Sequence, residues 1–173
     1  MSKVLEIIKK RRSIRSFKDT TIPQAVIDKL VEAIIWAPSA GNLQSRKFFF
    51  VYDDKVKAEL VRAAYDQKFL GQAPLVVVGC ADLTRASSRY EQRGMTLYAP
   101  QDVAASVQNL MLVATEEGLG TVWVGAFDEA EASKVLKLPE TLRPVVMVPV
   151  GYPAKTPNVV NRRPINELIE EVK

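Results

Sequence analysis

The stretch Leu75-Val76-Val77-Val78-Gly79-Cys80-Ala81 is a continuous run of apolar and small residues that follows Pro74. A short run of this kind, rich in β-branched side chains, is typical of a strand buried on both faces. Similar apolar runs at 48–52, 121–126 and 145–150 predict three further strands. Because helical patterns separate these runs, the sequence predicts an α+β (α/β) sandwich of helices around one sheet.

The helix before the first strand has the clearest boundaries. Thr21 and Gln24 form a capping-box pattern around Pro23, and the helix is expected to stop at Ala37 because Pro38 follows. The polar segment 84–96 has no clear period and is expected to be mobile or lid-like. Further helices are predicted at 2–12, 55–65, 101–117, 128–136, and from 164 or 165 to 172.

The predicted helix at 101–117 carries apolar side chains around most of its circumference, which is typical of a helix buried on nearly all sides. In a small domain, a second copy of the chain would bury part of that surface. Ala104, Ala105 and Ser106 are small enough to let another chain approach closely. The sequence therefore predicts a homodimer.

Composition bounds the function. The chain has 173 residues, a net charge of +4 and no histidine. The length predicts one domain spanning residues 1–173. The absence of histidine excludes Ser-His-Asp and Cys-His nucleophiles and HExxH zinc sites. The single cysteine, Cys80, lies in an apolar run and is expected to be a buried structural thiol. With no signal peptide and no membrane span, we expect a cytoplasmic protein.

The segment Arg11-Arg12-Ser13-Ile14-Arg15-Ser16-Phe17 places three guanidinium groups and two hydroxyls close together after the first helix. Guanidinium forks match phosphate oxygens, and Ser hydroxyls can complete an anion site. A solvated basic turn is the alternative. The loop 38–45 has small residues and two amides suited to a ligand edge, or it is simply a helix-to-strand connection.

Nucleotide-binding signatures of other folds are absent. Gly118, Gly120 and Gly125 do not form GxGxxG, because Trp123 stands where the third glycine would be needed. No GxxxxGK[ST] motif occurs. The charge is mild and the basic residues are scattered without an aromatic platform, so we expect no nucleic-acid partner.

Five segments in this order resemble the nitroreductase family of FMN-dependent oxidoreductases, and the resemblance runs nearly end to end. They are Arg11–Phe17, Pro38–Gln44, Gln101–Leu110, Gly118–Phe127, and Leu142-Arg143-Pro144 through Gly151-Tyr152-Pro153. The resemblance implies a nitroreductase-like α+β fold with a central, mostly antiparallel or mixed sheet. It also implies a homodimer with FMN at the interface and no catalytic side chain, because the flavin carries the chemistry.

The resemblance also assigns cofactor contacts. The basic loop would hold the FMN phosphate and ribityl chain, a loop of the other subunit would cover the isoalloxazine ring, and a strand-end backbone would face flavin N5 and O4. One of two C-terminal arginines would close on the phosphate. The implied cofactor-binding residues are Arg11, Arg12, Ser13, Arg15, Pro38, Ser39, Ala40, Asn42, Gln44, Gly125, Ala126, and Arg162 or Arg163.

The implied activity is ping-pong transfer of hydride from NADH or NADPH to a nitroaromatic, quinone or similar small-molecule acceptor. A same-fold flavoenzyme with dehalogenase or ene-type chemistry and a non-enzymatic FMN-binding protein are the alternatives. The chain departs from many relatives by placing Ser45-Arg46 where they have Pro-Trp. Arg85, Arg89, Tyr90, Arg93 and Tyr98 would face an acidic substrate or nicotinamide phosphate, or would be merely solvated.

Overall fold

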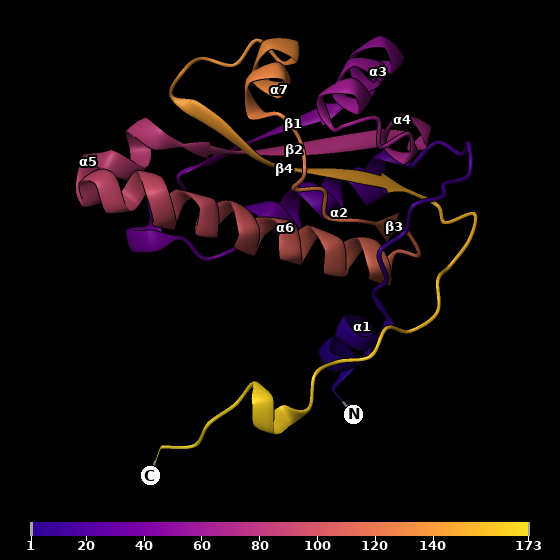
Figure 1. Ribbon diagram of the computed structural model, residues 1–173. Coiled ribbons are helices and arrows are strands. Elements are labelled where there is room, and N and C mark those ends of the chain that lie inside the picture. The colour runs from indigo at the N-terminus through magenta and orange to yellow at the C-terminus, as the bar shows by residue number, and fades with distance from the viewer. Residues whose placement is uncertain (1, 173) are drawn as a thin grey trace.

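The computed structural model describes residues 2–172 and consists of one sheet with helices on both faces (Figure 1). The sheet has the strand order β1-β2-β4-β3, and every pair of neighbouring strands is antiparallel. Along the chain, the elements are α1 (Lys3–Lys10), α2 (Gln24–Ile35), η1 (Ala40–Asn42), β1 (Arg46–Val51), α3 (Asp54–Ala63), α4 (Phe69–Gln72), β2 (Leu75–Asp82), α5 (Leu83–Arg93), η2 (Gly94–Tyr98), α6 (Ala99–Glu116), β3 (Gly120–Thr121), α7 (Glu129–Val135), β4 (Leu142–Gly151) and η3 (Ile165–Glu167). The α+β sandwich with a mostly antiparallel sheet is therefore confirmed.

Strand β2 explains why the molecule has two cores. Its side chains alternate across the sheet, as the period of a strand requires. Leu75 and Val77 pack with α2 and α6, whereas Val76, Val78 and Cys80 pack on the side of α3 and α7. All five side chains are fully buried, as predicted for this run.

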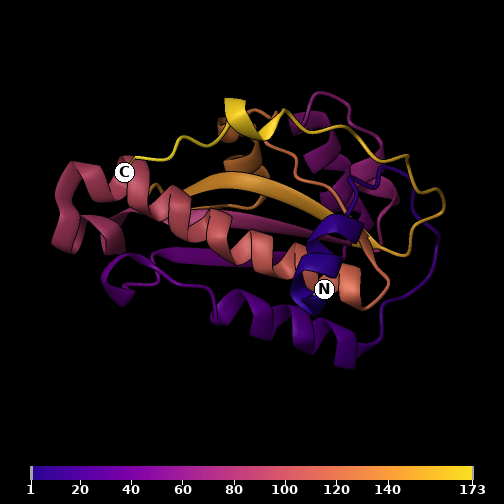
Figure 2. The same cartoon turned by 90° about the horizontal axis from the view of Figure 1, so that it is seen from below.

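The lower face of the sheet is covered by α6 and α2 (Figure 2). Helix α1 crosses near the C-terminal end of α6, where Lys3 forms an ion pair of 2.9 Å with Glu116. Within one chain, Ala104 and Ala105 of the long helix are half-buried, so the expectation that a second chain covers part of this helix stays a prediction. Ser106 points inward and donates to the Ile34 carbonyl, so it does not offer a surface to a second chain.

The segment 84–96, which the sequence predicts to be mobile or lid-like, is regular helical structure, and its mobility stays a prediction. It forms α5 and the π turn η2, with the Asp82 carboxylate capping α5 by accepting from the Arg85 N–H at 2.9 Å. The helical period is missing from the sequence because this unit buries little of its surface. Ala86 and Gly94 are its only buried residues between 83 and 98.

Three other expectations need correction. The predicted strand 121–126 is reduced to β3 and a single bridge from Val124 to Met147, because the chain leaves the sheet edge between these points. The capping box of α2 does not form, because the Gln24 side chain instead donates to Asp28 at 2.8 Å. The predicted C-terminal helix is only the single turn η3. Short helices are marginal without a surface to pack against.

Residues 154–172 extend away from the body as an arm, and every one of them is exposed (Figure 1). Val4, Leu5 and Ile8 of α1 are also exposed, and none of the residues of this helix is fully buried. Both segments therefore present apolar surface to the outside of this chain.

Candidate functional site

The basic loop is held by two apolar anchors and a backbone bond. Ile14 and Phe17 are buried together with Ala73, and the Ile14 N–H donates to the Thr121 carbonyl at 2.9 Å. The chain can approach so closely because position 120 is glycine, where a Cβ would lie 2.6 Å from Ile14 Cγ1. With Ile14 and Phe17 facing inward, the polar residues of the loop are left facing outward.

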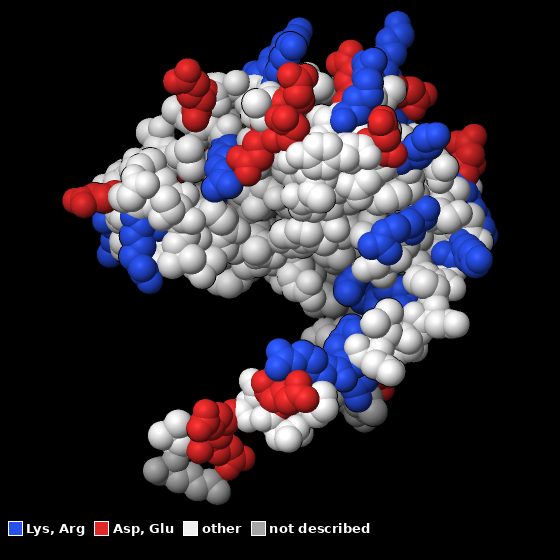
Figure 3. Space-filling view, viewed as in Figure 1, with Lys and Arg blue, Asp and Glu red and all other residues white. Residues whose placement is uncertain are grey.

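The outward residues Arg11, Arg12, Ser13 and Arg15 line one cleft of about 780 Å³ together with Arg162 from the C-terminal arm. No acidic residue lines this cleft. Burial lowers the pKa of Arg11, and the neighbouring charges of Arg162 and Arg12 lower it further. Figure 3 shows basic side chains gathered where the arm meets the body. Such uncompensated guanidinium charge is suited to binding an anion.

The arginines of the cleft are not equally available. One terminal nitrogen of Arg12 donates to the carbonyls of Lys9, Lys10 and Arg11 at the end of α1. Arg15 extends over the Phe69 ring at 5.9 Å from its centroid and forms no ion pair within residues 2–172. Arg12 is thus partly committed to closing its helix, whereas Arg15 keeps its donors for a ligand.

The two C-terminal arginines, which the sequence left as alternatives, differ in position. Arg162 lines the cleft, and one of its nitrogens donates to the Val160 carbonyl at 3.0 Å. Arg163 does not line it and instead bonds Glu167 at 3.1 Å, four residues along the chain. The geometry therefore brings Arg162, and not Arg163, next to the basic loop.

The loop 38–45 is fixed by a buried carboxylate. Asp102, which is only 4% exposed, accepts the Ala40 N–H at 3.0 Å and the Ser45 N–H at 3.3 Å. Within the loop, the Ser39 hydroxyl accepts the Gln44 N–H at 3.0 Å. Asn42 has a left-handed φ of 56°, a conformation that asparagine tolerates better than most residues. The loop is therefore a defined structure attached to the start of α6.

Arg46 ties the same loop to the end of α2. Its guanidinium donates to the carbonyls of Ile35, Ala37 and Pro38 at 3.2, 2.8 and 2.9 Å, and to that of Asp102 at 3.4 Å. Burial lowers the pKa of Arg46, while the charge of Asp102 acts in the opposite direction. Arg46 is thus a cross-link between α2, α6 and the loop.

The two halves of the implied cofactor site do not meet within one chain. Loop 38–45 is attached to Asp102 near the beginning of α6, whereas Ile14 packs on Gly120 just beyond its end. An 18-residue helix is about 27 Å long, so it separates the two halves by roughly that distance. The structure unites Arg11, Arg12, Ser13, Arg15 and Arg162, and leaves the loop residues Pro38, Ser39, Ala40, Asn42 and Gln44 at the other end.

The segment 121–126 runs from the basic loop toward α7. Gly125 and Ala126 are exposed, and the Ala126 carbonyl accepts the Gln67 side chain at 2.9 Å. For the N–H groups of Gly125 and Ala126, no hydrogen bond occurs within residues 2–172. These two donors therefore remain available to a ligand.

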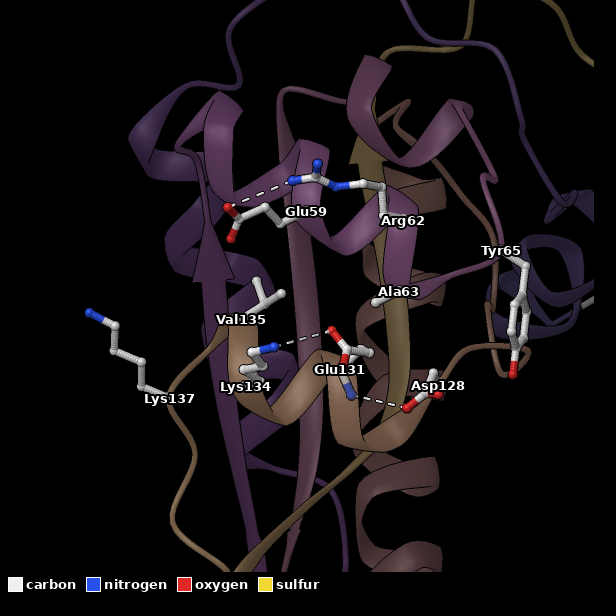
Figure 4. Close-up of a pocket in the computed structure, with 9 residues that line it drawn as sticks. All are labelled: Glu59, Arg62, Ala63, Tyr65, Asp128, Glu131, Lys134, Val135 and Lys137. Carbon is white, nitrogen blue, oxygen red and sulfur yellow. Dashed lines mark hydrogen bonds and ion pairs between the residues drawn. The ribbon is translucent and has the colours of Figure 1, made fainter.

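A second large cavity, of about 590 Å³, lies between α3 and α7 on the opposite face of the sheet (Figure 4). Four of its charged side chains are paired with one another: Arg62 with Glu59 at 3.8 Å and Lys134 with Glu131 at 4.0 Å. Asp128 caps α7 by accepting from the Glu131 N–H at 3.0 Å, as its predicted N-cap role requires. None of the sequence-predicted site residues lines this cavity.

Comparison with known proteins identifies the family. A family model described as the nitroreductase family matches residues 8–67 and 61–152. A Methanothermobacter thermautotrophicus protein, provisionally named an NADH dehydrogenase/NAD(P)H nitroreductase, is 32% identical over 158 residues, which cover 89% of this chain and 79% of the relative. The chain belongs to the nitroreductase family.

Other members of the nitroreductase family agree with this assignment. A Bacillus subtilis protein named an NAD(P)H FMN reductase is 30% identical over 167 residues, covering 89% of this chain and 67% of the relative. The structure of the NADPH:FMN oxidoreductase of Vibrio harveyi, solved with NAD+, has a TM-score of 0.91 and 27% identity. That match covers 99% of this chain and 78% of the other.

Sequence reasoning within the nitroreductase family missed two residues that shape the site. From the sequence, Asp102 is recognised only as part of the segment Gln101–Leu110, and Arg46 only as a departure from many relatives. A charged residue inside a mostly apolar helix is a usable signal, because a buried carboxylate requires hydrogen-bond donors. The identity of those donors, the Ala40 and Ser45 N–H groups, depends on tertiary contacts.

Across residues 2–172, the structure has no helix that combines the length and the hydropathy needed to cross a bilayer.

Proposed function

We propose that this member of the nitroreductase family is an FMN-dependent oxidoreductase that uses NADH or NADPH. The observation that carries the proposal is the cleft lined by Arg11, Arg12, Arg15 and Arg162 with the Ser13 hydroxyl and no acidic side chain. A phosphate monoester is a dianion that needs this kind of neutralisation and forked donors. The residues present therefore fit the phosphate end of FMN.

Each half of the site has its own task. Arg11, Arg15 and Arg162 hold the phosphate, and Ser13 completes the cage together with the donors that Arg12 does not spend on α1. The N–H groups of Gly125 and Ala126 face the ring edge. Pro38, Ser39, Ala40, Asn42 and Gln44 of the partner subunit cover the ring. Arg163 stays outside, bonded to Glu167.

Bound FMN supplies the redox chemistry, because it accepts hydride from the nicotinamide and returns the electrons to a nitroaromatic, quinone or similar acceptor. We propose a ping-pong order, in which the donor leaves before the acceptor enters. The protein contributes fixed backbone donors and a loop that excludes water, and needs no titrating side chain. This is consistent with a chain that has no histidine.

The proposal includes a homodimer. Loop 38–45 and the arginine cleft lie at opposite ends of α6, so a second chain is needed to bring them together. Large apolar side chains on α1, α2 and the arm are exposed, an amount that monomeric proteins rarely leave uncovered. These residues are Val4, Leu5, Ile8, Val31, Ile35, Trp36, Val159, Val160, Ile165, Leu168 and Ile169. The single-domain organisation and the cytoplasmic location stay predictions.

The first test is the absorbance spectrum of the purified protein before and after anaerobic addition of NADH or NADPH. We expect the bands of oxidised flavin, and we expect them to bleach on addition. A colourless protein that also fails to take up added FMN would contradict the proposal. If the protein retains flavin but neither NADH nor NADPH reduces that flavin, the proposed activity would be wrong and only flavin binding would be left.

A matched pair of variants tests the phosphate assignment. Arg162→Ala is expected to weaken FMN binding by about 1.5 to 3 kcal/mol, roughly ten- to hundredfold in Kd, as for a lost charge-assisted contact. Arg163→Ala removes the same charge from the neighbouring residue, which bonds Glu167 and does not line the cleft. The FMN affinity of this control variant should therefore match wild type. Equal affinities for Arg162→Ala and wild type would show that the cleft does not hold the phosphate.

A further inference from the structure

A cluster of arginine and tyrosine side chains lies on α5 and η2, at the end of the molecule that carries loop 38–45. We call Arg85, Arg89, Tyr90, Arg93 and Tyr98 the Arg–Tyr cluster. Basic side chains lie over α5 near the left edge of Figure 3, with an acidic side chain beside them. The proposed function has so far given this cluster no role.

The cluster is organised by ring contacts. The guanidinium of Arg89 lies 5.5 Å from the centroid of Tyr90, and that of Arg93 lies 5.3 Å from the centroid of Tyr98. The Tyr98 hydroxyl accepts the Arg93 Nε–H at 2.9 Å. The two tyrosine rings meet edge to face at 5.0 Å, which joins both Arg–Tyr pairs into one unit. The charges are therefore held on a packed surface.

The cluster contacts the loop that the proposed function places over the flavin ring. Arg85 donates from Nε to the Leu43 carbonyl. A Cβ on Gly41 would lie 2.6 Å from the Tyr90 hydroxyl and 2.9 Å from a terminal nitrogen of Arg89, so both side chains rest on the loop backbone. A substrate stacked beside this loop would meet these side chains at once.

The arginines of the cluster, Arg85, Arg89 and Arg93, are not paired with acidic side chains in the part of the chain that the structure describes. Arg62, Arg143 and Arg163, by contrast, each pair with a glutamate. The backbone between the two Arg–Tyr pairs is also strained, because Glu91 has a φ of 47°. Strain of this kind concentrates at functional positions.

We propose that the Arg–Tyr cluster binds the 2′-phosphate of the nicotinamide donor and gives this protein a preference for NADPH over NADH. The inference rests on the proposed function. Quinones and nitroaromatics are commonly neutral, whereas a nicotinamide dinucleotide always carries phosphates, so the donor is the substrate that matches an uncompensated basic surface. The 2′-phosphate is a compact dianion, and guanidinium forks are well suited to it.

The kinetic test uses the double variant Arg89→Gln/Arg93→Gln, which leaves the Arg85 bond to the loop intact. With a neutral quinone in excess, we expect KM for NADPH to rise about tenfold and KM for NADH much less, since each partly exposed charge contributes modestly. Arg62→Gln is the control, because it removes an arginine charge on α3, outside the cluster, and should change neither KM. An unchanged KM for NADPH, or equal rises for both donors, would overturn the proposal.

A binding test needs no turnover. Titration of the wild-type holoprotein with adenosine 2′,5′-bisphosphate and with 5′-AMP should show tighter binding of the bisphosphate, and the double variant should lose that difference. Equal affinities for the two nucleotides in wild type would overturn the inference. Flavin that is bound and reduced in the same preparation would show that the proposed function still stands. If the double variant changes KM only for an anionic acceptor, the cluster binds the acceptor, and the proposal that it binds the 2′-phosphate of the donor is wrong.

Discussion

Replacing Asp102 by asparagine is expected to destabilise the protein and to release loop 38–45. The wild-type carboxylate is 4% exposed and accepts two backbone N–H groups, from Ala40 at 3.0 Å and from Ser45 at 3.3 Å. An amide has the same shape, but it has only one acceptor oxygen. Its NH2 group would face one of the two backbone donors, and that donor would lose its partner.

The magnitude follows from those contacts. A hydrogen bond to a charged group contributes about 1.5 to 3 kcal/mol, and a buried donor left unpaired costs about 1 to 3 kcal/mol. One bond is lost and the other weakened, so we expect the free energy of unfolding to fall by about 2 to 4 kcal/mol. The nearby Arg46 guanidinium would also lose the charge that opposes the effect of burial on its pKa.

Urea unfolding followed by circular dichroism measures this loss, and hydrogen exchange locates it. The Ala40 and Ser45 amides should exchange faster in Asp102→Asn than in wild type. Asp19→Asn is the matched control, because Asp19 is exposed and should change stability by no more than about 0.5 kcal/mol. A variant as stable as wild type, or one whose Ala40 and Ser45 amides keep their protection, would refute the reasoning.

Three further predictions concern other parts of the fold. Gly120→Ala would place a Cβ 2.6 Å from Ile14 Cγ1, and urea unfolding should show a loss of about 1 to 3 kcal/mol from overpacking. The hydrogen bond from Arg143 lowers the pKa of Glu129 in the folded protein. The ionised Glu129 therefore stabilises the fold above its unfolded pKa, and this stabilisation is lost as the pH falls through its folded pKa. The difference in unfolding free energy between wild type and Glu129→Gln should shrink on acidification. Burial raises the pKa of Cys80 to about 12, so a thiol reagent at about pH 8 should label it only after unfolding.

The elements that could be predicted from sequence are those whose pattern is set by burial. The run 75–81 lies between two cores, so its apolar residues give the strand and its depth directly. Helix α7 was found through Asp128, whose capping bonds are local. The segment 121–126 alternates correctly, with Val122 and Val124 buried, but its backbone leaves the sheet. Strand pairing depends on the neighbouring strand, which local sequence does not contain.

For the candidate site, residue type was easier to predict than position. The arginine-rich loop indicated an anion site, and the cleft contains Arg11, Arg12 and Arg15 with Arg162. Local sequence could not distinguish Arg162 from Arg163 as the phosphate ligand, because the distinction depends on which of the two side chains bonds Glu167. The roles of residues in the predicted site as a whole stay predictions.

The position of the two half-sites at opposite ends of α6 has a thermodynamic consequence. If FMN needs residues from two chains, it binds only to the assembled pair, and each bound flavin shifts the association equilibrium toward that pair. Dilution would then remove cofactor even when free FMN is kept constant. Protein concentration, as well as flavin supply, would set how much of the enzyme in a cell is able to work.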